Sequence, residues 1–425
     1  MTLSIKSVHP FAPTAKPPLE RLCQRRCTVS MKTAQPTRAI GAPSKWERLV
    51  IGSEGCQTQP LSRLGKRWKE YHGSKNWEGL LDPLDDGLRD EIMRYGSFIE
   101  AAYKCFDSNP PSPSYSASHI NDSNVNESGY RVTKNLYATS SIPVPPWLGI
   151  GERSSWIGYV AVCEDQNEIT RLGRRDIVIS LRGTGTCLEW LENLRATLTR
   201  CPFGNVKQSN GQHDTPMVES GVLSLYTSST SVCQSLQQSV KDEILRLVEV
   251  YGDEPLSVTI TGHSLGASLA ILAAYDIKNT IKHELHLSVI SFGGPRVGNR
   301  SFRHNLELQG TKILRIVNSD DLITRVPGFF VEDHDDVEKH EKTHVEHLPH
   351  WIRKRVNDKR WVYANIGHEL RLSSRASLKL NSIDVATCHD LKTYLHLVNG
   401  FVSSSCPFRA SARMMLNKAS TVPPT

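Results

Sequence analysis

Residues 258–277, VTITGHSLGASLAILAAYDI, decide the fold of this chain. The stretch begins as an apolar, β-branched run that ends at Thr261, which is the pattern of a buried strand. The sequence GHSLG (262–266) comes next, and an alanine-rich run then predicts a helix. Between a strand and a helix, the Gly-x-Ser-x-Gly pattern holds a serine on a tight turn with its hydroxyl exposed and backbone amides beside it. We therefore predict that Ser264 is a nucleophile.

The residues around Ser264 form the predicted nucleophile elbow: Gly262, His263 and Gly266. The two glycines supply the space for the turn, because a Cβ at either position would strike the neighbouring strand or helix. The helix that follows points its N-terminus at the serine, and this end of a helix favours a developing negative charge.

Strands and helices alternate on both sides of this motif. Asp85 can cap a helix whose apolar positions recur at three and four residues from Leu88 to Ala102. Further helices are predicted over 236–251 and 265–277, and strands over 156–162, 177–181, 256–261, 287–292 and 313–317. Apolar strands that alternate with helices predict an α/β domain with a mostly parallel central sheet flanked by helices.

The positive charge of the chain lies in its N-terminus. The net charge is +7, and residues 1–45 contain eight Lys/Arg and a single acid, Glu20, so the remaining residues are balanced. A neutral body excludes a basic nucleic-acid-binding protein, and no nucleic acid is expected as a partner. The Ser/Thr-rich, acid-poor start without a long apolar run predicts an organelle transit peptide rather than a secretory signal.

Other segments exclude further classes of protein. No apolar stretch reaches 18 residues, so no transmembrane segment is predicted. The ten cysteines are scattered without Cys-x-x-Cys pairs, which indicates buried thiols rather than a disulfide framework or a zinc ribbon. Residues 46–75 are polar and predict a linker, and the Pro/Ser/Asn-rich residues 107–128 predict a loop.

Several segments together resemble one family, the class 3 lipases, which are α/β-hydrolases. They are the GHSLG motif with ISLRGTGTCLEWLENL (179–194), SFGGPRVGN (291–299) and RIVNSDDLITRVP (315–327). The plant phospholipase A1 branch of chloroplast type is similar to the chain in NWEGLLDPLD (76–85), WIGYVAV (156–162), RLGRRDIVI (171–179) and CHDLKTYLHLVNGF (388–401). The resemblance covers residues 65 to 405 and implies an α/β-hydrolase fold of the class 3 lipase type.

A serine hydroxyl is a poor nucleophile at neutral pH and needs a histidine base, which a carboxylate holds in the correct tautomer. The resemblance implies Ser264, Asp321 and His389 for these roles, in the chain order usual for this fold. Asp320 is the alternative acid, although the spacing from neighbouring motif residues favours Asp321. His396 is the alternative base, with a structural role expected instead.

The oxyanion of the tetrahedral intermediate needs two backbone donors. One is the amide of Leu265, directly after the nucleophile. The resemblance places the other at Thr184, in the Arg182-Gly183-Thr184 segment that follows an earlier strand. A plain turn after that strand is the alternative interpretation.

A second motif, His340-Glu341-Lys342-Thr343-His344, fits the His-Glu-x-x-His pattern of zinc proteases. The surrounding residues 331–350 are nearly all charged and lack the apolar face that would bury a zinc helix against a cleft. We interpret this segment as a solvated surface loop that binds metal adventitiously at most, and we expect no metal and no organic cofactor.

The resemblance implies an acylhydrolase that cleaves the sn-1 ester of phospholipids and plastid galactolipids at a membrane surface and releases fatty acid for oxylipin or jasmonate synthesis. The alternatives are a lipase-fold scaffold that acts through protein partners and a triacylglycerol lipase. No protein partner is evident from the sequence. The predicted organisation is a plastid transit peptide over 1–45, a linker over 46–75, the lipase domain over 76–405 and a C-terminal tail over 406–425.

Residues 197–217 are the predicted lid over the site. The segment is short and polar, so it is expected to cover the site incompletely and to give little interfacial activation. A surface loop without a gating role is the alternative. Asn365 and Asn399 stand where the family pattern has His and Asp, which leaves the substrate preference open.

Overall fold

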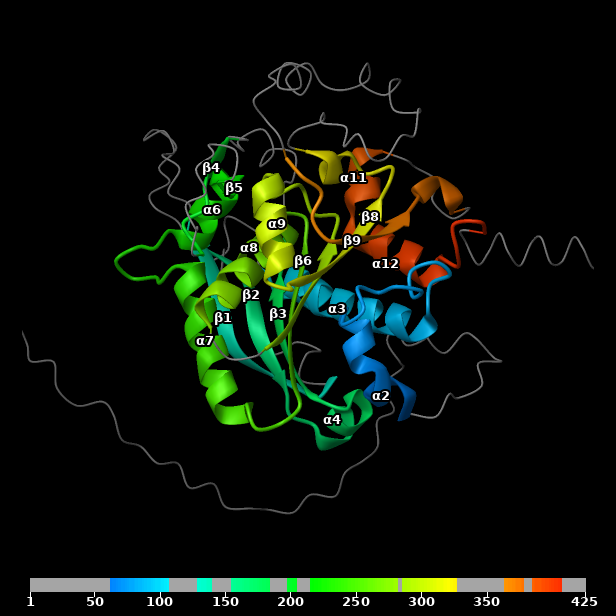
Figure 1. The fold of residues 1–425 in the computed structure, drawn as a ribbon, viewed down its shortest axis with the longest axis horizontal. Coiled ribbons are helices and arrows are strands. Elements are labelled where there is room, and N and C mark those ends of the chain that lie inside the picture. The colour runs from blue at the N-terminus through cyan, green and yellow to red at the C-terminus, as the bar shows by residue number, and fades with distance from the viewer. Residues whose placement is uncertain are drawn as a thin grey trace, which may run out of the picture. The chain divides into compact units, whose positions relative to one another are not determined.

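The computed structural model describes residues 62–106, 128–139, 154–183, 197–204, 215–281, 285–326, 363–377 and 384–406. These residues all belong to one unit, residues 59–425. Within them, a central sheet of seven strands has the order β1-β2-β3-β6-β7-β8-β9 (Figure 1). Its strands are β1 (Tyr130–Thr139), β2 (Ser154–Cys163), β3 (Arg175–Leu181), β6 (Leu256–His263), β7 (His286–Phe292), β8 (Lys312–Asn318) and β9 (His368–Leu372).

The pairing of the strands is parallel from β3 to β9. The pairs β3–β6, β6–β7, β7–β8 and β8–β9 are parallel. Toward the other edge of the sheet, the pairs β1–β2 and β2–β3 are antiparallel. The mostly parallel sheet predicted from the sequence is therefore confirmed, with an antiparallel extension at one edge.

Helices pack on this sheet, and four of those described, α6, α7, α8 and α9, lie in the chain between parallel strands, as βαβ units require. They are α2 (Ser62–Tyr71), α3 (Asp86–Cys105), α4 (Gln166–Leu172), α6 (Ser220–Thr227), α7 (Leu236–Tyr251), α8 (Leu265–Thr280), α9 (Arg300–Leu308), α11 (Val385–His389) and α12 (Leu391–Gly400). Two strands outside the sheet, β4 (Leu198–Arg200) and β5 (Met217–Glu219), form an antiparallel pair.

Two apolar cores lie on opposite faces of the sheet. Side chains alternate along a strand, and on β3 the residues Ile177 and Ile179 join one core whereas Val178 joins the other. The first core contains the buried faces of α6, α7 and α8, and the second contains those of α3 and α12. Because both faces are covered, the strands are apolar on both sides, which is why they appear in the sequence as continuous apolar runs.

The helix predicted to begin at Asp85 is α3. The Asp85 side chain accepts hydrogen bonds from the amides of Gly87 and Leu88, so it is the expected N-cap. The apolar positions predicted from the spacing, among them Leu88 and Ile99, are fully buried. The boundaries of α7 match the predicted helix, and the strands predicted at 256–261 and 313–317 each extend by one or two residues at their ends.

Helix α2 and strands β1 and β9 are among the elements that were not predicted from the sequence. The predicted linker 46–75 ends in a helix, α2, on which Trp68 and Tyr71 are buried, so the folded domain begins before residue 76. Strands β1 and β9 were not predicted. Each lies at an edge of the sheet, where alternate side chains reach solvent and polar residues such as Lys134 and Glu369 interrupt the apolar pattern.

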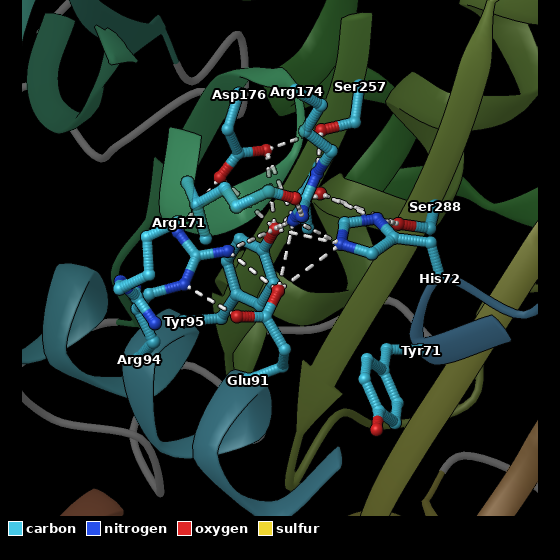
Figure 2. A network of polar contacts seen from close by, with 12 residues as sticks. Tyr71, His72, Glu91, Arg94, Tyr95, Arg171, Arg174, Asp176, Ser257 and Ser288 are labelled. Carbon is cyan, nitrogen blue, oxygen red and sulfur yellow. Dashed lines mark hydrogen bonds and ion pairs between the residues drawn. The ribbon is translucent and has the colours of Figure 1, made fainter. Parts of the chain in front are cut away.

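A buried polar network lies where β3, β6 and β7 begin (Figure 2). Arg174 Nη2 lies 3.0 Å from Glu91 Oε2, and Arg94 Nη1 lies 2.9 Å from Asp176 Oδ2. Ser257 accepts from Arg174 and donates to Asp176. Burial opposes the ionisation of Glu91, but the two arginines outweigh it and hold the pKa of that carboxyl well below its usual range.

His72 joins this network as a neutral ring. Arg174 has only N–H donors and lies 2.7 Å from His72 Nε2, so that nitrogen accepts. The proton is therefore on Nδ1, which donates to Ser288 Oγ at 3.0 Å. Burial first, and Arg174 second, lower the pKa of His72 to about 4. The network joins α2 and α3 to the sheet at the N-terminal ends of its parallel strands. The Gly-x-Ser-x-Gly turn lies at the C-terminal end of β6.

Candidate active site

Ser264 lies on the turn between β6 and α8. Its backbone has φ 57° and ψ −123°, in a region that residues with a Cβ rarely occupy. The amide of Ser264 donates to the carbonyl of Phe292 on β7 at 3.0 Å, which holds the strained turn against the sheet. Directly after it, Leu265 opens α8, so its amide is among those that have no partner within the helix.

Glycines make this turn possible by letting three backbone segments approach. A Cβ on Gly262 would collide with the Gly266 carbonyl oxygen, and one on Gly266 would lie 2.6 Å from the Arg182 carbonyl oxygen. A Cβ on Gly183 would lie 3.0 Å from the Cβ of Ser264. The segment that follows β3 is therefore pressed directly against the turn that carries the serine.

An aspartate–histidine pair stands at the ends of β8 and α11. Asp321 Oδ2 lies 2.7 Å from His389 Nδ1, and the carboxylate is fully buried. The amide of Ile323 donates to Asp321 Oδ1 at 2.9 Å, and the Tyr394 hydroxyl donates to Oδ2 at 2.7 Å. An ionised carboxylate can only accept, so the Nδ1 proton of His389 points at Asp321 and Nε2 is left as the acceptor.

His263 connects this pair to the serine turn. Its Nε2 lies 2.8 Å from the carbonyl oxygen of His389, and the two rings are 4.8 Å apart between centroids. Burial first, and His389 second, lower the pKa of His263 to about 3, so the ring is neutral. The residue that precedes Ser264 is thus hydrogen-bonded to the backbone of His389.

Comparisons with known proteins identify the family of this chain. The family described as lipase (class 3) matches residues 178–331. The chloroplastic phospholipase A(1) DAD1 of Arabidopsis thaliana is 55% identical over 419 residues, which cover 93% of this chain and 92% of that protein. This chain belongs to the class 3 lipase family. The family predicted from the sequence motifs is confirmed, and so is the α/β-hydrolase fold.

Two further proteins are similar to this chain. The chloroplastic galactolipase DONGLE of Arabidopsis thaliana is 40% identical over 359 residues, covering 80% of this chain and 71% of that protein. Among solved structures, the lipase from Rhizopus microsporus var. chinensis is 22% identical, with a TM-score of 0.39 over 58% of this chain and 71% of that chain.

In this lipase, Asp320 and His396, the alternative acid and base, have other partners. Asp320 Oδ1 lies 2.9 Å from Arg375 Nε, and Asp320 Oδ2 accepts from the Ser373 hydroxyl. His396 Nε2 lies 3.0 Å from Ser377 Oγ. The structure therefore joins Asp321 with His389 and places Asp320 and His396 in separate contacts.

Some predicted residues lie outside the described part of the chain. Thr184, the zinc-like segment 340–344 and residues 1–45 are outside it, as is the middle of the predicted lid, 205–214. The two ends of that lid segment are described and contain β4 and the first residue of β5. Within the described ranges, no group of three or more His, Cys, Asp or Glu side chains is arranged to hold a metal ion. Every helix described there is too short or too polar to span a bilayer.

Two tyrosines at the site were not predicted from the sequence. Tyr394 contacts Asp321 from α12, and Tyr103 lies 2.8 Å from His263 Nδ1 at the end of α3. Tyr394 stands inside the quoted segment 388–401, but nothing in that pattern distinguishes it from a core residue. Tyr103 is separated from its partner by 160 positions in the chain, so only the folded structure brings them together.

Proposed function

We propose that this chain is an acylhydrolase that cleaves the sn-1 ester of glycerolipids through a Ser-Asp-His acyl-enzyme mechanism. The observation that carries the proposal is the Asp321–His389 hydrogen bond of 2.7 Å beside the strained turn of Ser264. A buried carboxylate that fixes a histidine tautomer next to an elbow serine is the arrangement that activates a hydroxyl for attack on an acyl carbonyl.

The reaction then proceeds in two transfers. Nε2 of His389 takes the proton of the Ser264 hydroxyl, and Oγ attacks the acyl carbonyl to form a tetrahedral oxyanion. The amides of Leu265 and Thr184 stabilise this oxyanion. As the C–O bond to the glyceride breaks, His389 returns its proton to the departing oxygen. Water repeats the sequence on the acyl-enzyme and releases the fatty acid. This mechanism uses neither a metal nor an organic cofactor.

The names of the relatives support the substrate class. One is a phospholipase A(1) and another a galactolipase, and both are chloroplastic. We therefore propose phospholipids and galactolipids at the plastid membrane surface as substrates, with residues 1–45 as the transit peptide. The released fatty acid would then be available for oxylipin synthesis. The lipase domain would begin at α2 rather than at residue 76, and a short polar lid would favour these polar lipids over triacylglycerol.

The test is the Ser264→Ala variant, without residues 1–45, assayed on phosphatidylcholine, monogalactosyldiacylglycerol and triacylglycerol labelled at sn-1 or sn-2. We expect kcat to fall by roughly 10⁴- to 10⁶-fold, because the nucleophile is removed. Ser268→Ala is the matched control. Ser268 is buried on the same helix, and its hydroxyl donates to the Pro295 carbonyl at 3.4 Å, so this variant should keep its activity.

Near-normal hydrolysis by Ser264→Ala would contradict the mechanism and support the scaffold alternative. Release of label mainly from sn-2 would contradict the positional proposal. Triacylglycerol as the best substrate would favour the neutral-lipid alternative.

A further inference from the structure

Tyr103, at the end of α3, meets both the segment after β3 and the serine turn. Its hydroxyl accepts from the amide of Gly183 at 2.8 Å and lies 2.8 Å from His263 Nδ1. The other backbone group of Gly183, its carbonyl, accepts from Arg182 Nη1 at 2.6 Å. Gly183 is thus held through its amide and its carbonyl at the place where it presses on Ser264.

The direction of each proton in this chain of contacts follows from chemistry. The carbonyl of His389 can only accept, so His263 Nε2, 2.8 Å away, carries a proton and donates it. The ring of His263 is neutral, so its Nδ1 must accept, and the Tyr103 hydroxyl is the donor. The result is a continuous series of hydrogen bonds from Gly183 through Tyr103 and His263 to His389, in which each bond polarises the next.

We infer that Tyr103 and His263 are positioning residues for acyl transfer, an inference that rests on the function proposed above. Their hydrogen bonds set the separation between the backbone of Gly183 on one side of Ser264 and the backbone of His389 on the other. Neither side chain touches the substrate in this role. Because acyl transfer requires reacting groups to be held within a fraction of an ångström, a small shift along this series lowers the rate of the chemical step.

The Tyr103→Phe variant tests this inference, because it keeps the ring and removes the hydroxyl that joins Gly183 to His263. A fluorophosphonate that labels the active serine gives the number of active sites, and p-nitrophenyl butyrate gives kcat and KM per site. We expect kcat to fall by about 10- to 100-fold, KM to stay within about twofold, and the rate of phosphonate labelling to fall in parallel with kcat.

Tyr159→Phe is the matched control. Tyr159 also bonds α3, since its hydroxyl donates to the carbonyl of Phe98 at 2.9 Å, and this hydrogen bond does not involve the serine turn. We expect this variant to keep wild-type kcat per labelled site, even where its melting temperature falls by a few degrees. A loss of kcat in both variants would show that the effect arises from a general destabilisation of α3, and would overturn the inference.

His263→Asn is the second variant, and it gives a direct test of coupling to Tyr103. If one series of hydrogen bonds operates, the double variant should lose no more kcat than the worse single variant. If the double variant loses the product of the two single losses in kcat, the inference is overturned. A Tyr103→Phe enzyme with wild-type kcat per site would also overturn it. If Tyr103→Phe does not fold, the kcat and labelling rate of His263→Asn decide alone. Activity retained by Ser264→Ala would instead contradict the proposed function, whatever Tyr103 does.

Discussion

At the scale of the residue, the two adjacent aspartates differ in what they contact. Asp321 is buried and faces His389 Nδ1 at 2.7 Å, whereas Asp320 pairs with Arg375, whose side chain is 65% exposed. We predict that Asp321→Asn lowers kcat by about 10⁴-fold, because an amide can stabilise the wrong tautomer of the histidine and cannot support its positive charge. Asp320→Asn should change kcat by less than about threefold, because Asp320 contacts Arg375 and Ser373 rather than His389.

The measurement is kcat for each purified variant, with the melting temperature as a check on folding. The same comparison applies to the histidines, with His389→Ala inactive and His396→Ala active. An inactive Asp320→Asn that folds normally would show that the roles of the two aspartates have been exchanged.

The resemblance to the class 3 lipases, with its chain order and motif spacing, predicted which residues serve this site, but not how they are held. Asp321 could be placed because it follows a strand whose apolar pattern is visible. The positive φ of Ser264 and the hydrogen bond from Tyr394 to Asp321 could not be predicted. They depend on the angle at which α12 and the segment after β3 approach, and local sequence does not encode that angle.

Among the helices and strands, the buried polar network in Figure 2 joins α2 and α3 to the N-terminal ends of the parallel strands. Its central member, Arg174, is 1% exposed and bonds Glu91, His72 and Ser257. We predict that Arg174→Met lowers the free energy of unfolding by about 3 kcal/mol or more, because it leaves a buried carboxylate with one arginine instead of two. Urea denaturation measures the change.

Arg131→Gln is the control for this prediction. Arg131 pairs with Glu164 on the surface, with side chains 51% and 40% exposed, so its loss should cost less than about 1 kcal/mol. The kcat of folded Arg174→Met should match that of the wild type, because the network lies at the N-terminal ends of the parallel strands and Ser264 lies at the C-terminal end of β6. Equal destabilisation by the two substitutions would contradict a structural role for the network.

The elements that are buried along nearly their whole length could be predicted from the sequence. Those that are buried on only one side could not. Strand β6 and helix α8 are buried along nearly their whole length, so their sequences show the apolar run and the alanine-rich pattern without interruption. Helix α2 is polar except on the side that carries Trp68 and Tyr71, so its ten residues are indistinguishable from a linker until their tertiary contacts are known.

At the scale of the whole molecule, two buried histidines make stability depend on pH. The folded-state pKa is about 4 for His72 and about 3 for His263, against 6.5 for an ordinary histidine. The unfolded chain therefore binds more protons than the folded one below pH 6.5. The stability that the neutral rings contribute is fully present above pH 6.5 and is lost as the pH falls towards 4.

Glu219 acts in the opposite direction. Burial raises its pKa to about 7 from 4.5, although the amides of Gly221 and Val222 donate to it. The stability associated with its protonated form is present below pH 4.5 and is lost as the pH rises to 7. Between pH 4.5 and 6.5, unfolding thus takes up two protons at the histidines and releases one from Glu219. The net uptake of one proton makes the free energy of unfolding fall by about 1 kcal/mol per pH unit on acidification.

Two variants should change this slope in opposite directions. His72→Gln removes one proton uptake, so the free energy of unfolding should become almost independent of pH between 4.5 and 6.5. Glu219→Gln removes the proton release, so the slope should roughly double. Urea denaturation at several pH values measures both slopes, and the comparison uses slopes because each substitution also changes the absolute stability. Parallel curves for the wild type and both variants would mean that these buried groups do not titrate with folding, and that the acid sensitivity of the protein arises at its surface.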